Sequence, residues 1–118
     1  MGDPVTHFEI NSSDPERART FYSDVFTWLM KPARPANYKF ADPDAGGIGI
    51  WGGIGPKRLQ RSFMTLYISV RDLDETLRKV VASGGTVIAP PYEPGTGTWI
   101  AHFTDPDGNI VSLLKAEP

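Results

Sequence analysis

The sequence contains no cysteine among its 118 residues. Disulfide frameworks, thiolate metal sites and cysteine nucleophiles are therefore excluded, and the composition fits a reducing compartment. An excess of positive charge is also lacking, because 14 acidic residues stand against 12 basic ones and the formal net charge is −2. With no basic stripe to neutralise phosphates, the sequence argues against nucleic acid as the main partner.

Long apolar runs are absent as well. No run is long enough to span a bilayer, and the first residues lack the apolar segment of a signal peptide. We therefore expect a cytoplasmic protein with no membrane partner. Histidine is scarce, with 2 residues, whereas aromatic residues make up 11% of the chain and could line a pocket.

The opening residues of the chain predict a strand. Residues 5–11 alternate between apolar and polar side chains, which is typical of a strand with one buried face. Phe8 and Ile10 share one face of this strand, and His7 and Glu9 share the other. We expect a core on the first face and a more polar surface on the second.

A helix is predicted directly after this strand. Asp14 is a suitable N-cap residue and Pro15 fits the first helical turn. Apolar side chains then recur at helical spacing to about Trp28. Because that spacing is typical of a buried helix face, we expect three aromatic residues to pack in the core: Phe21, Tyr22 and Phe26.

The second half of the chain repeats this plan. Residues 63–70 alternate as the first strand does, and Asp72 is placed to cap a helix that ends near Gly84. Two Asp-Pro-Asp turns, which begin at Asp42 and Asp105, also match each other between apolar runs. Each half therefore predicts a strand, a helix and about three further strands.

The repeat defines the domain organisation. A module of this size is marginal alone, so the two modules must pack together or swap with a partner. We expect one domain over residues 1–118, with modules at about 5–55 and 62–116. The basic residues between the modules predict a solvated link: Lys57, Arg58 and Arg61.

Three segments carry a resemblance to a known family. They are HFEI…DPERARTFYSDVF (residues 7–26), ISVRDLDETLRKVVASGG (residues 68–85) and FTDPDGNIVSLL (residues 103–114). Together they resemble the vicinal oxygen chelate superfamily of glyoxalases, bleomycin-resistance proteins and extradiol dioxygenases. The resemblance implies an α+β fold in which two βαβββ modules form an eight-stranded half-open barrel, with helices outside and a ligand groove inside.

Alternation places a set of polar residues on the groove side. In the last strands the apolar face of Trp99, Ala101 and Phe103 leaves His102 on the opposite side, and the internal repeat gives Lys39 the matching place in the first module. Trp51, which lies among glycines, could form a stacking wall or a dimer contact. The ligand-binding residues that we expect are His7, Lys39, Trp51, Thr65, Tyr67 and Ser112.

The resemblance also implies where a divalent metal would bind. Metal-dependent members use His, Gln and Glu side chains from four strands, and His7 matches the first of these positions. The other three positions fall on Thr65, Ser112 and a site near Gly49 or Ile50. One imidazole would hold an ion weakly. We therefore predict no cofactor, and the alternative is a site rebuilt from His7, Glu9 and His102.

Three functions remain open. The first is a metal-independent protein that binds a small organic molecule. The second is a lactoylglutathione-lyase-related, isomerase or dioxygenase-type enzyme. It would use either the rebuilt metal site or metal-free chemistry in which His102 acts as a general acid or base with Glu9 or Tyr67. Glu9 could instead pair with Lys39. The third is an interaction module with a vestigial groove. The resemblance implies a homodimer in each case.

Overall fold

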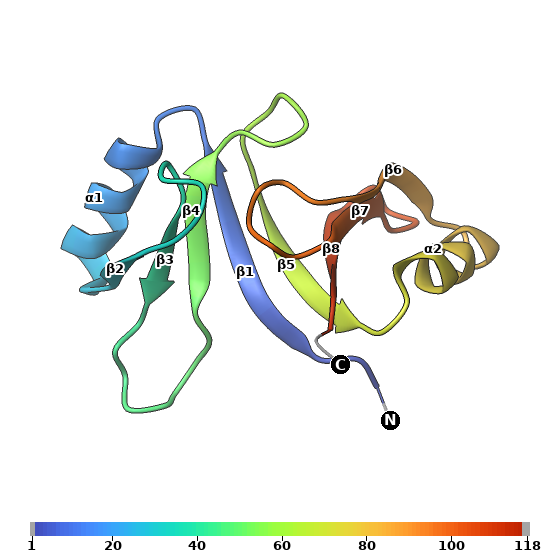
Figure 1. The fold of residues 1–118 in the computed structure, drawn as a ribbon, viewed down its shortest axis with the longest axis horizontal. Helices are drawn as coiled ribbons and strands as arrows, with labels where there is room; N and C mark the ends of the chain where they lie inside the picture. Colours follow the sequence, from blue (N-terminus) through green and yellow to red (C-terminus); the bar gives the residue numbers. More distant parts are fainter. Residues whose placement is uncertain (1, 117–118) are drawn as a thin grey trace. The chain divides into compact units, whose positions relative to one another are not determined.

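The computed structural model describes residues 2–116, which form two helices and eight strands (Figure 1). These residues divide into two compact units. The N-terminal unit is His7–Met64, and the C-terminal unit comprises residues 2–6 together with residues 65–116. Each unit has its own small core.

The N-terminal unit follows the order strand, helix, three strands. Its strands lie in the order β2-β3-β4-β1, with β1 parallel to β4 and antiparallel pairing elsewhere. The elements are β1 (Val5–Ser12), α1 (Pro15–Phe26), β2 (Leu29–Pro32), β3 (Lys39–Asp42) and β4 (Gly52–Pro56).

The helix α1 begins as the sequence predicts. The Asp14 carboxylate accepts a hydrogen bond from the backbone N–H of Arg17, at 3.1 Å, and Pro15 opens the first turn. The helix ends at Thr27, whose φ of 60° lies in the left-handed region. The core beneath it consists of Ile10, Ala41 and Ile54.

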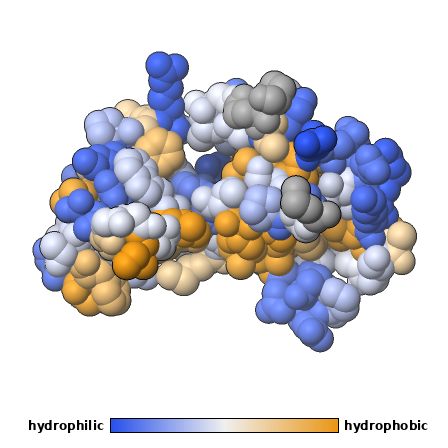
Figure 2. All heavy atoms as spheres, turned by 90° about the horizontal axis from the view of Figure 1, so that it is seen from below, coloured by the Kyte–Doolittle hydropathy of each residue, from blue (hydrophilic) through white to orange (hydrophobic). Residues whose placement is uncertain are grey.

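The expectation that all three helix aromatics lie in the core is wrong for two of them. Tyr22 packs against the core, but Phe21 and Phe26 are 56% and 55% exposed. Figure 2 shows hydrophobic residues at the surface of the molecule among hydrophilic ones. The aromatic rings instead pack on one another, with Tyr22 stacked on Trp28 at 5.3 Å between ring centroids and Phe26 on Trp28 at 5.6 Å.

The C-terminal unit has the same topology. Its strands lie in the order β5-β8-β7-β6, with β5 parallel to β8. The elements are β5 (Phe63–Val70), α2 (Leu73–Ala82), β6 (Thr86–Tyr92), β7 (Ile100–Thr104) and β8 (Ile110–Lys115). The first two residues of β5 are assigned to the N-terminal unit.

The helix α2 covers the core of the C-terminal unit. The Asp72 carboxylate accepts from the backbone N–H of Glu75 at 3.0 Å, which is the predicted cap. Leu73 and Leu77 are the buried residues of the helix, and they join a cluster with Val70, Ala101 and Leu113. The opposite faces of β5 and β8 therefore carry the polar side chains of this unit.

The predicted fold class is confirmed. The protein is an α+β protein in which a βαβββ arrangement occurs twice, and the repeat recognised in the sequence corresponds to the two sets of strands. The boundaries proposed for the domain and its modules stay a prediction. Within residues 2–116, no helix is long and apolar enough to cross a membrane.

Candidate functional site

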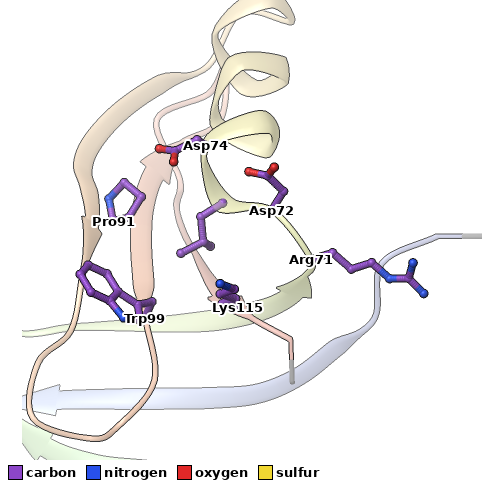
Figure 3. Close-up of a pocket in the computed structure, with 7 residues that line it drawn as sticks. Arg71, Asp72, Asp74, Pro91, Trp99 and Lys115 are labelled. Atoms are coloured by element: carbon purple, nitrogen blue, oxygen red, sulfur yellow. The ribbon is translucent and has the colours of Figure 1, made fainter. Parts of the chain in front are cut away.

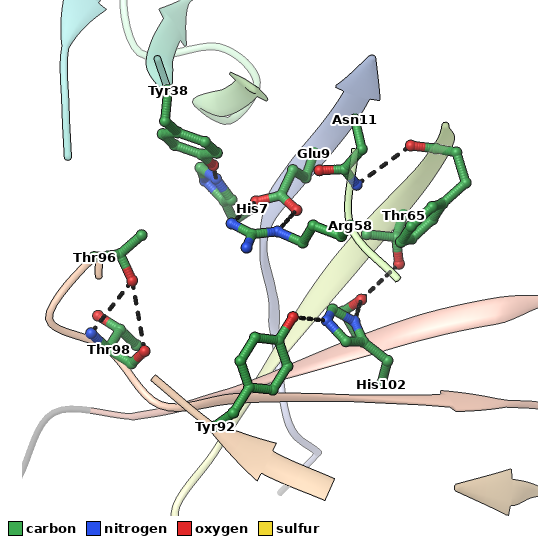
Figure 4. A network of polar contacts seen from close by, with 12 residues as sticks. His7, Glu9, Asn11, Tyr38, Arg58, Thr65, Tyr92, Thr96, Thr98 and His102 are labelled. Atoms are coloured by element: carbon green, nitrogen blue, oxygen red, sulfur yellow. Dashed lines mark hydrogen bonds and ion pairs between the residues drawn. The ribbon is translucent and has the colours of Figure 1, made fainter. Parts of the chain in front are cut away.

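A buried ion pair lies on the polar face of the N-terminal unit (Figure 4). Glu9, on β1, is 2% exposed, and its two carboxylate oxygens accept from Nε and Nη2 of Arg58 at 2.6 and 3.3 Å. The solvated link expected at Arg58 is therefore wrong for this residue. The pairing of Glu9 with Lys39 is also replaced, because Arg58 occupies both oxygens.

His7 and Tyr38 extend this cluster. The hydroxyl group of Tyr38 lies 2.9 Å from Nε2 of His7, and the Tyr38 side chain is 4% exposed. Burial lowers the pKa of His7, although the charge of Glu9 opposes that shift. Burial and the adjacent carboxylate of Glu9 raise the pKa of the Tyr38 hydroxyl far above its usual value. At neutral pH the fold therefore favours an uncharged imidazole beside a protonated phenol.

Two glycines of β4 make the space that Tyr38 occupies. A Cβ atom on Gly53 would lie 1.6 Å from the Tyr38 hydroxyl oxygen, and one on Gly55 would lie 2.5 Å from Cδ2 of the ring. Gly53 is the register partner of Glu9. Two of the glycines that follow Trp51 thus have a packing function.

Lys39 does not lie where the repeat predicts. Its register partner on β4 is Ile54, a fully buried core residue, whereas Phe40 is paired with Gly53 on the polar face. The place that His102 holds in the C-terminal unit therefore belongs to Phe40, and the position expected for Lys39 is wrong by one residue. When the two units are aligned on their Asp-Pro-Asp turns, the pairing of β3 with β4 is shifted by one residue relative to the pairing of β7 with β8.

Aromatic side chains continue the polar face beyond the cluster. The ring of Phe40 meets His7 edge to face at 6.2 Å between centroids and approaches Trp51 at 6.1 Å. Trp51 is 46% exposed. The expected stacking wall is thus an exposed indole next to the buried polar residues.

Asn11 adds an acceptor on the same face of β1. Its Nδ2 donates to the backbone carbonyl of Phe63 at 3.3 Å. Its Oδ1 is buried and has no hydrogen-bond partner among residues 2–116. A buried acceptor without a donor costs about 1–3 kcal/mol of stability. This oxygen is therefore placed to accept a hydrogen bond from an N–H or O–H group outside the described residues.

A second polar chain runs through the C-terminal unit (Figure 4). The Tyr92 hydroxyl lies 2.6 Å from Nε2 of His102, and Nδ1 of the same ring lies 2.6 Å from Oγ of Ser112. Ser112 Oγ lies 2.9 Å from Oγ1 of Thr65. Both ring nitrogens of His102 are therefore held by hydroxyl groups.

Burial limits the chemistry that this chain of hydrogen bonds can perform. His102 and Ser112 are fully buried, and Tyr67 is 2% exposed with its ring 6.2 Å from that of His102. The structure thus brings together Thr65, Tyr67, His102 and Ser112, as expected from their shared face. In this conformation the imidazole has hydroxyl partners instead of an open path to a substrate.

The residues present do not fit a divalent metal centre. The four family positions hold His7, Thr65, Ser112 and, by its register with Glu9, Gly53 instead of the region of Gly49. No group of three or more His, Asp and Glu residues within 2–116 is arranged to hold an ion. The Glu9 carboxylate also already binds Arg58.

Sequence reasoning missed three residues of these clusters: Tyr38, Arg58 and Tyr92. Tyr38 precedes β3, and Arg58 lies in a loop that no motif marks. Tyr92 follows register shifts in β6, so strand alternation does not place it. The neighbouring glycines are the single sequence signal for a large side chain at Tyr38.

A comparison with models of known protein families identifies one family. The family model described as "Glyoxalase/Bleomycin resistance protein/Dioxygenase superfamily" matches residues 5–113. "Putative glyoxylase CFP32" of Mycobacterium bovis is 26% identical over 92% of this chain and 44% of its own length, so the chain spans less than half of that relative. A "Glyoxylase-like domain-containing protein" of Didymella fabae is 29% identical over 92% of this chain and 91% of its own length.

Solved structures share the fold at low identity. A glyoxalase/bleomycin resistance protein/dioxygenase superfamily member from Vibrio splendidus has a TM-score of 0.63 at 16% identity, covering 97% of this chain and 98% of its own. Methylmalonyl-CoA epimerase from Mycobacterium tuberculosis has a TM-score of 0.60 at 15% identity, covering 97% of this chain and 88% of its own. At these identities the likeness concerns the fold alone.

Proposed function

The chain belongs to the glyoxalase/bleomycin resistance protein/dioxygenase superfamily, and on this premise we propose that it binds a small organic molecule without a divalent metal. The binding surface is the polar strand face of the N-terminal unit. The observation that carries this proposal is the Glu9–Arg58 ion pair, which is buried on that polar face.

The presence of a buried ion pair is weak evidence that the pair stabilises the fold. The desolvation of two charges offsets most of their attraction, and well-packed apolar residues often serve the fold as well or better. Perturbed titratable groups also cluster at functional sites, and the charges of this pair act on both His7 and Tyr38. The exposed indole of Trp51 supplies an apolar wall next to them. The ligand class is a small aromatic or carbonyl compound that stacks on Trp51.

A thermal-shift screen of small aromatic and carbonyl compounds tests the proposal. A ligand present at 100 times its Kd adds about 2.7 kcal/mol of stability. The Trp51→Ala variant should lose the shift, whereas Trp99→Ala, a change of an equally exposed indole in the C-terminal unit, should keep it. Silence across a broad library would favour an interaction module.

Metal independence has its own test. Elemental analysis of the purified protein, followed by titration with nickel, manganese, zinc and iron, should give no stoichiometric ion. The His7→Ala variant should then have the same metal content as the parent protein. Stoichiometric metal that disappears in this variant would overturn the proposal.

The His7–Tyr38 hydrogen bond favours a second candidate function. Burial keeps the imidazole of His7 uncharged at neutral pH, and an uncharged imidazole can accept a proton from carbon next to a carbonyl group once a substrate displaces the Tyr38 hydroxyl from Nε2. The activity would be isomerase or lyase chemistry. Exchange of such protons in deuterated water, followed by proton NMR and abolished in His7→Gln, would identify the enzyme; exchange that persists in the variant would exclude His7 as the base.

A further inference from the structure

A separate pocket of about 350 Å³ lies in the C-terminal unit, at the start of α2 (Figure 3). Its walls come from the first residues of α2, the end of β6, the residue before β7 and the end of β8. It shares no residue with the Tyr92–His102–Ser112–Thr65 chain. Its volume is within the range of small-molecule sites.

One wall of the pocket is apolar and flat. Trp99 is 50% exposed, and in Figure 3 its indole lies on the same side as Pro91. Leu73, a core residue at the start of α2, also lines the pocket. A half-exposed indole with an apolar neighbour is a surface on which a ring can stack.

The other walls carry one acidic and one basic group. Within residues 2–116, neither the Asp74 carboxylate nor the Lys115 ammonium group takes part in an ion pair or side-chain hydrogen bond. Asp72 differs, because its carboxylate caps α2. Arg71 also differs, because its guanidinium points away from the pocket in Figure 3.

We propose that this pocket binds a zwitterionic aromatic amino compound, either a free aromatic amino acid or a short peptide that begins with one. The ring stacks on Trp99, the ammonium group of the ligand faces Asp74, and its carboxylate faces Lys115. A ligand with one charge would leave one of these two groups without an opposite charge, so simple amines and simple acids gain less from the pocket than a zwitterion does.

Titrations followed by NMR of the backbone amide and indole N–H groups test this proposal on the full chain. The probes are L-phenylalanine and the dipeptide phenylalanyl-glycine, and the tighter of the two identifies the source of the ligand. The expected result is a saturable shift of the Trp99 indole N–H and of the first amides of α2. 3-Phenylpropionate, which lacks the ammonium group, and phenethylamine, which lacks the carboxylate, should bind about tenfold more weakly.

Matched variants separate the pocket from a nonspecific effect. Asp74→Asn and Lys115→Met should each weaken binding about tenfold, and Trp99→Ala should abolish the saturable shift. Asp107→Asn and Lys57→Met change exposed charges outside the pocket and should leave the affinity unchanged. Thermal melts of all variants verify that they are folded.

Three results would overturn the proposal. They are the absence of a saturable shift with both probes, shifts that persist in Asp74→Asn and Lys115→Met, and equal affinity for 3-phenylpropionate. Trp51 does not line this pocket, so the Trp51→Ala variant should still bind the two probes here. Failure of this proposal can therefore be distinguished from failure of the proposed binding on the N-terminal unit.

Discussion

The Nε atom of Arg58 lies 2.6 Å from Oε1 of Glu9, across 49 positions of sequence. The loop that delivers Arg58 turns through Leu59 and Gln60, whose φ angles of 52° and 61° lie in the left-handed region. Side chains other than glycine cost about 1–2 kcal/mol per residue there. The chain thus accepts a strained turn next to a buried ion pair, a combination that is typical of functional sites.

Arg58→Met should strongly destabilise the protein. It leaves the Glu9 carboxylate buried and unpaired, a change that costs about 3–5 kcal/mol. The double variant Glu9→Met with Arg58→Met should recover much of this loss, because no charge then remains in the site. Denaturation by urea measures both free energies of unfolding.

Arg61 provides the control for this prediction. It is exposed in the same loop and contacts the ring of Phe63 at 5.9 Å without a buried anion. Arg61→Met should change the free energy of unfolding by less than about 0.5 kcal/mol. Equal changes in the free energy of unfolding for the two single variants would show that Arg58 contributes no more to stability through its pair with Glu9 than the exposed Arg61 does.

The titration of His7 should report the charges around it. Burial holds its pKa below the ordinary value of 6.5, the charge of Glu9 raises it and the charge of Arg58 lowers it. Glu9→Gln should therefore lower the pKa of His7 further, and Arg58→Met should raise it. NMR of the ring protons follows each titration directly, since the chain has 2 histidines.

The same group makes stability depend on pH. As the pH falls below 6.5, the unfolded chain takes up a proton before the buried imidazole does, so unfolding becomes easier. The contribution of the neutral imidazole is complete above pH 6.5 and declines down to the pKa of the folded state. His7→Gln should remove this part of the acid sensitivity, and an unchanged pH profile of urea unfolding would contradict the assignment.

The sequence was sufficient to predict the fold and the strand faces on which several of the site residues lie. Caps at Asp14 and Asp72 and strand alternation are local signals, and they predicted both modules. Alternation also placed Glu9 and His102 on the polar faces. A repeat aligned on turn residues fails where the register shifts, which is why Lys39 was placed where Phe40 lies.

The partners of the site residues depend on contacts distant in sequence. Arg58 reaches Glu9 from a loop, and Tyr38 enters a space that exists because Gly53 has no side chain. Neither relationship leaves a periodic pattern. Arg58 and Tyr38, which lie outside the strands, complete the N-terminal cluster, and Tyr92 at the end of β6 completes the C-terminal one. Local reasoning captures none of these three contacts.

Gly53→Ala should disrupt the N-terminal cluster. The new methyl group would lie 1.6 Å from the Tyr38 hydroxyl oxygen and must displace that side chain. Overpacking of this kind costs about 1–3 kcal/mol. In Gly53→Ala combined with Tyr38→Ala, the loss of stability should be smaller than the sum of the single changes. Additive losses would mean that the two residues do not compete for the same space.

Tyr38 should also confer sensitivity to alkaline pH. Because its pKa is raised far above 10, the unfolded chain loses the phenolic proton first, and stability falls as the pH rises above 10. Tyr38→Phe should flatten this alkaline decline. Urea unfolding of both proteins near pH 10 and above measures the difference, and parallel profiles would argue against the burial of this hydroxyl.

The hydroxyl of Ser112 should be important for the C-terminal unit. Ser112→Ala leaves Nδ1 of the fully buried His102 without its partner at 2.6 Å and removes the contact with Thr65. The cost of such an unpaired buried group is about 1–3 kcal/mol. Ser83→Ala, at an exposed position after α2, is the matched control and should be nearly neutral. Equal stabilities of the two variants would contradict the hydrogen-bonded chain.

The homodimer stays a prediction, and α1 offers a place to test it. Phe21, Val25 and Phe26 are each more than half exposed on this one helix, an unusual concentration of apolar area. If the dimer buries this face, Phe21→Ser with Phe26→Ser should shift the sedimentation of the protein from dimer to monomer. Val81→Ser, an equally exposed change on α2, should leave the dimer intact. A parent protein that sediments as a monomer would contradict the dimer, and a dimer that tolerates both serines would place its interface away from α1.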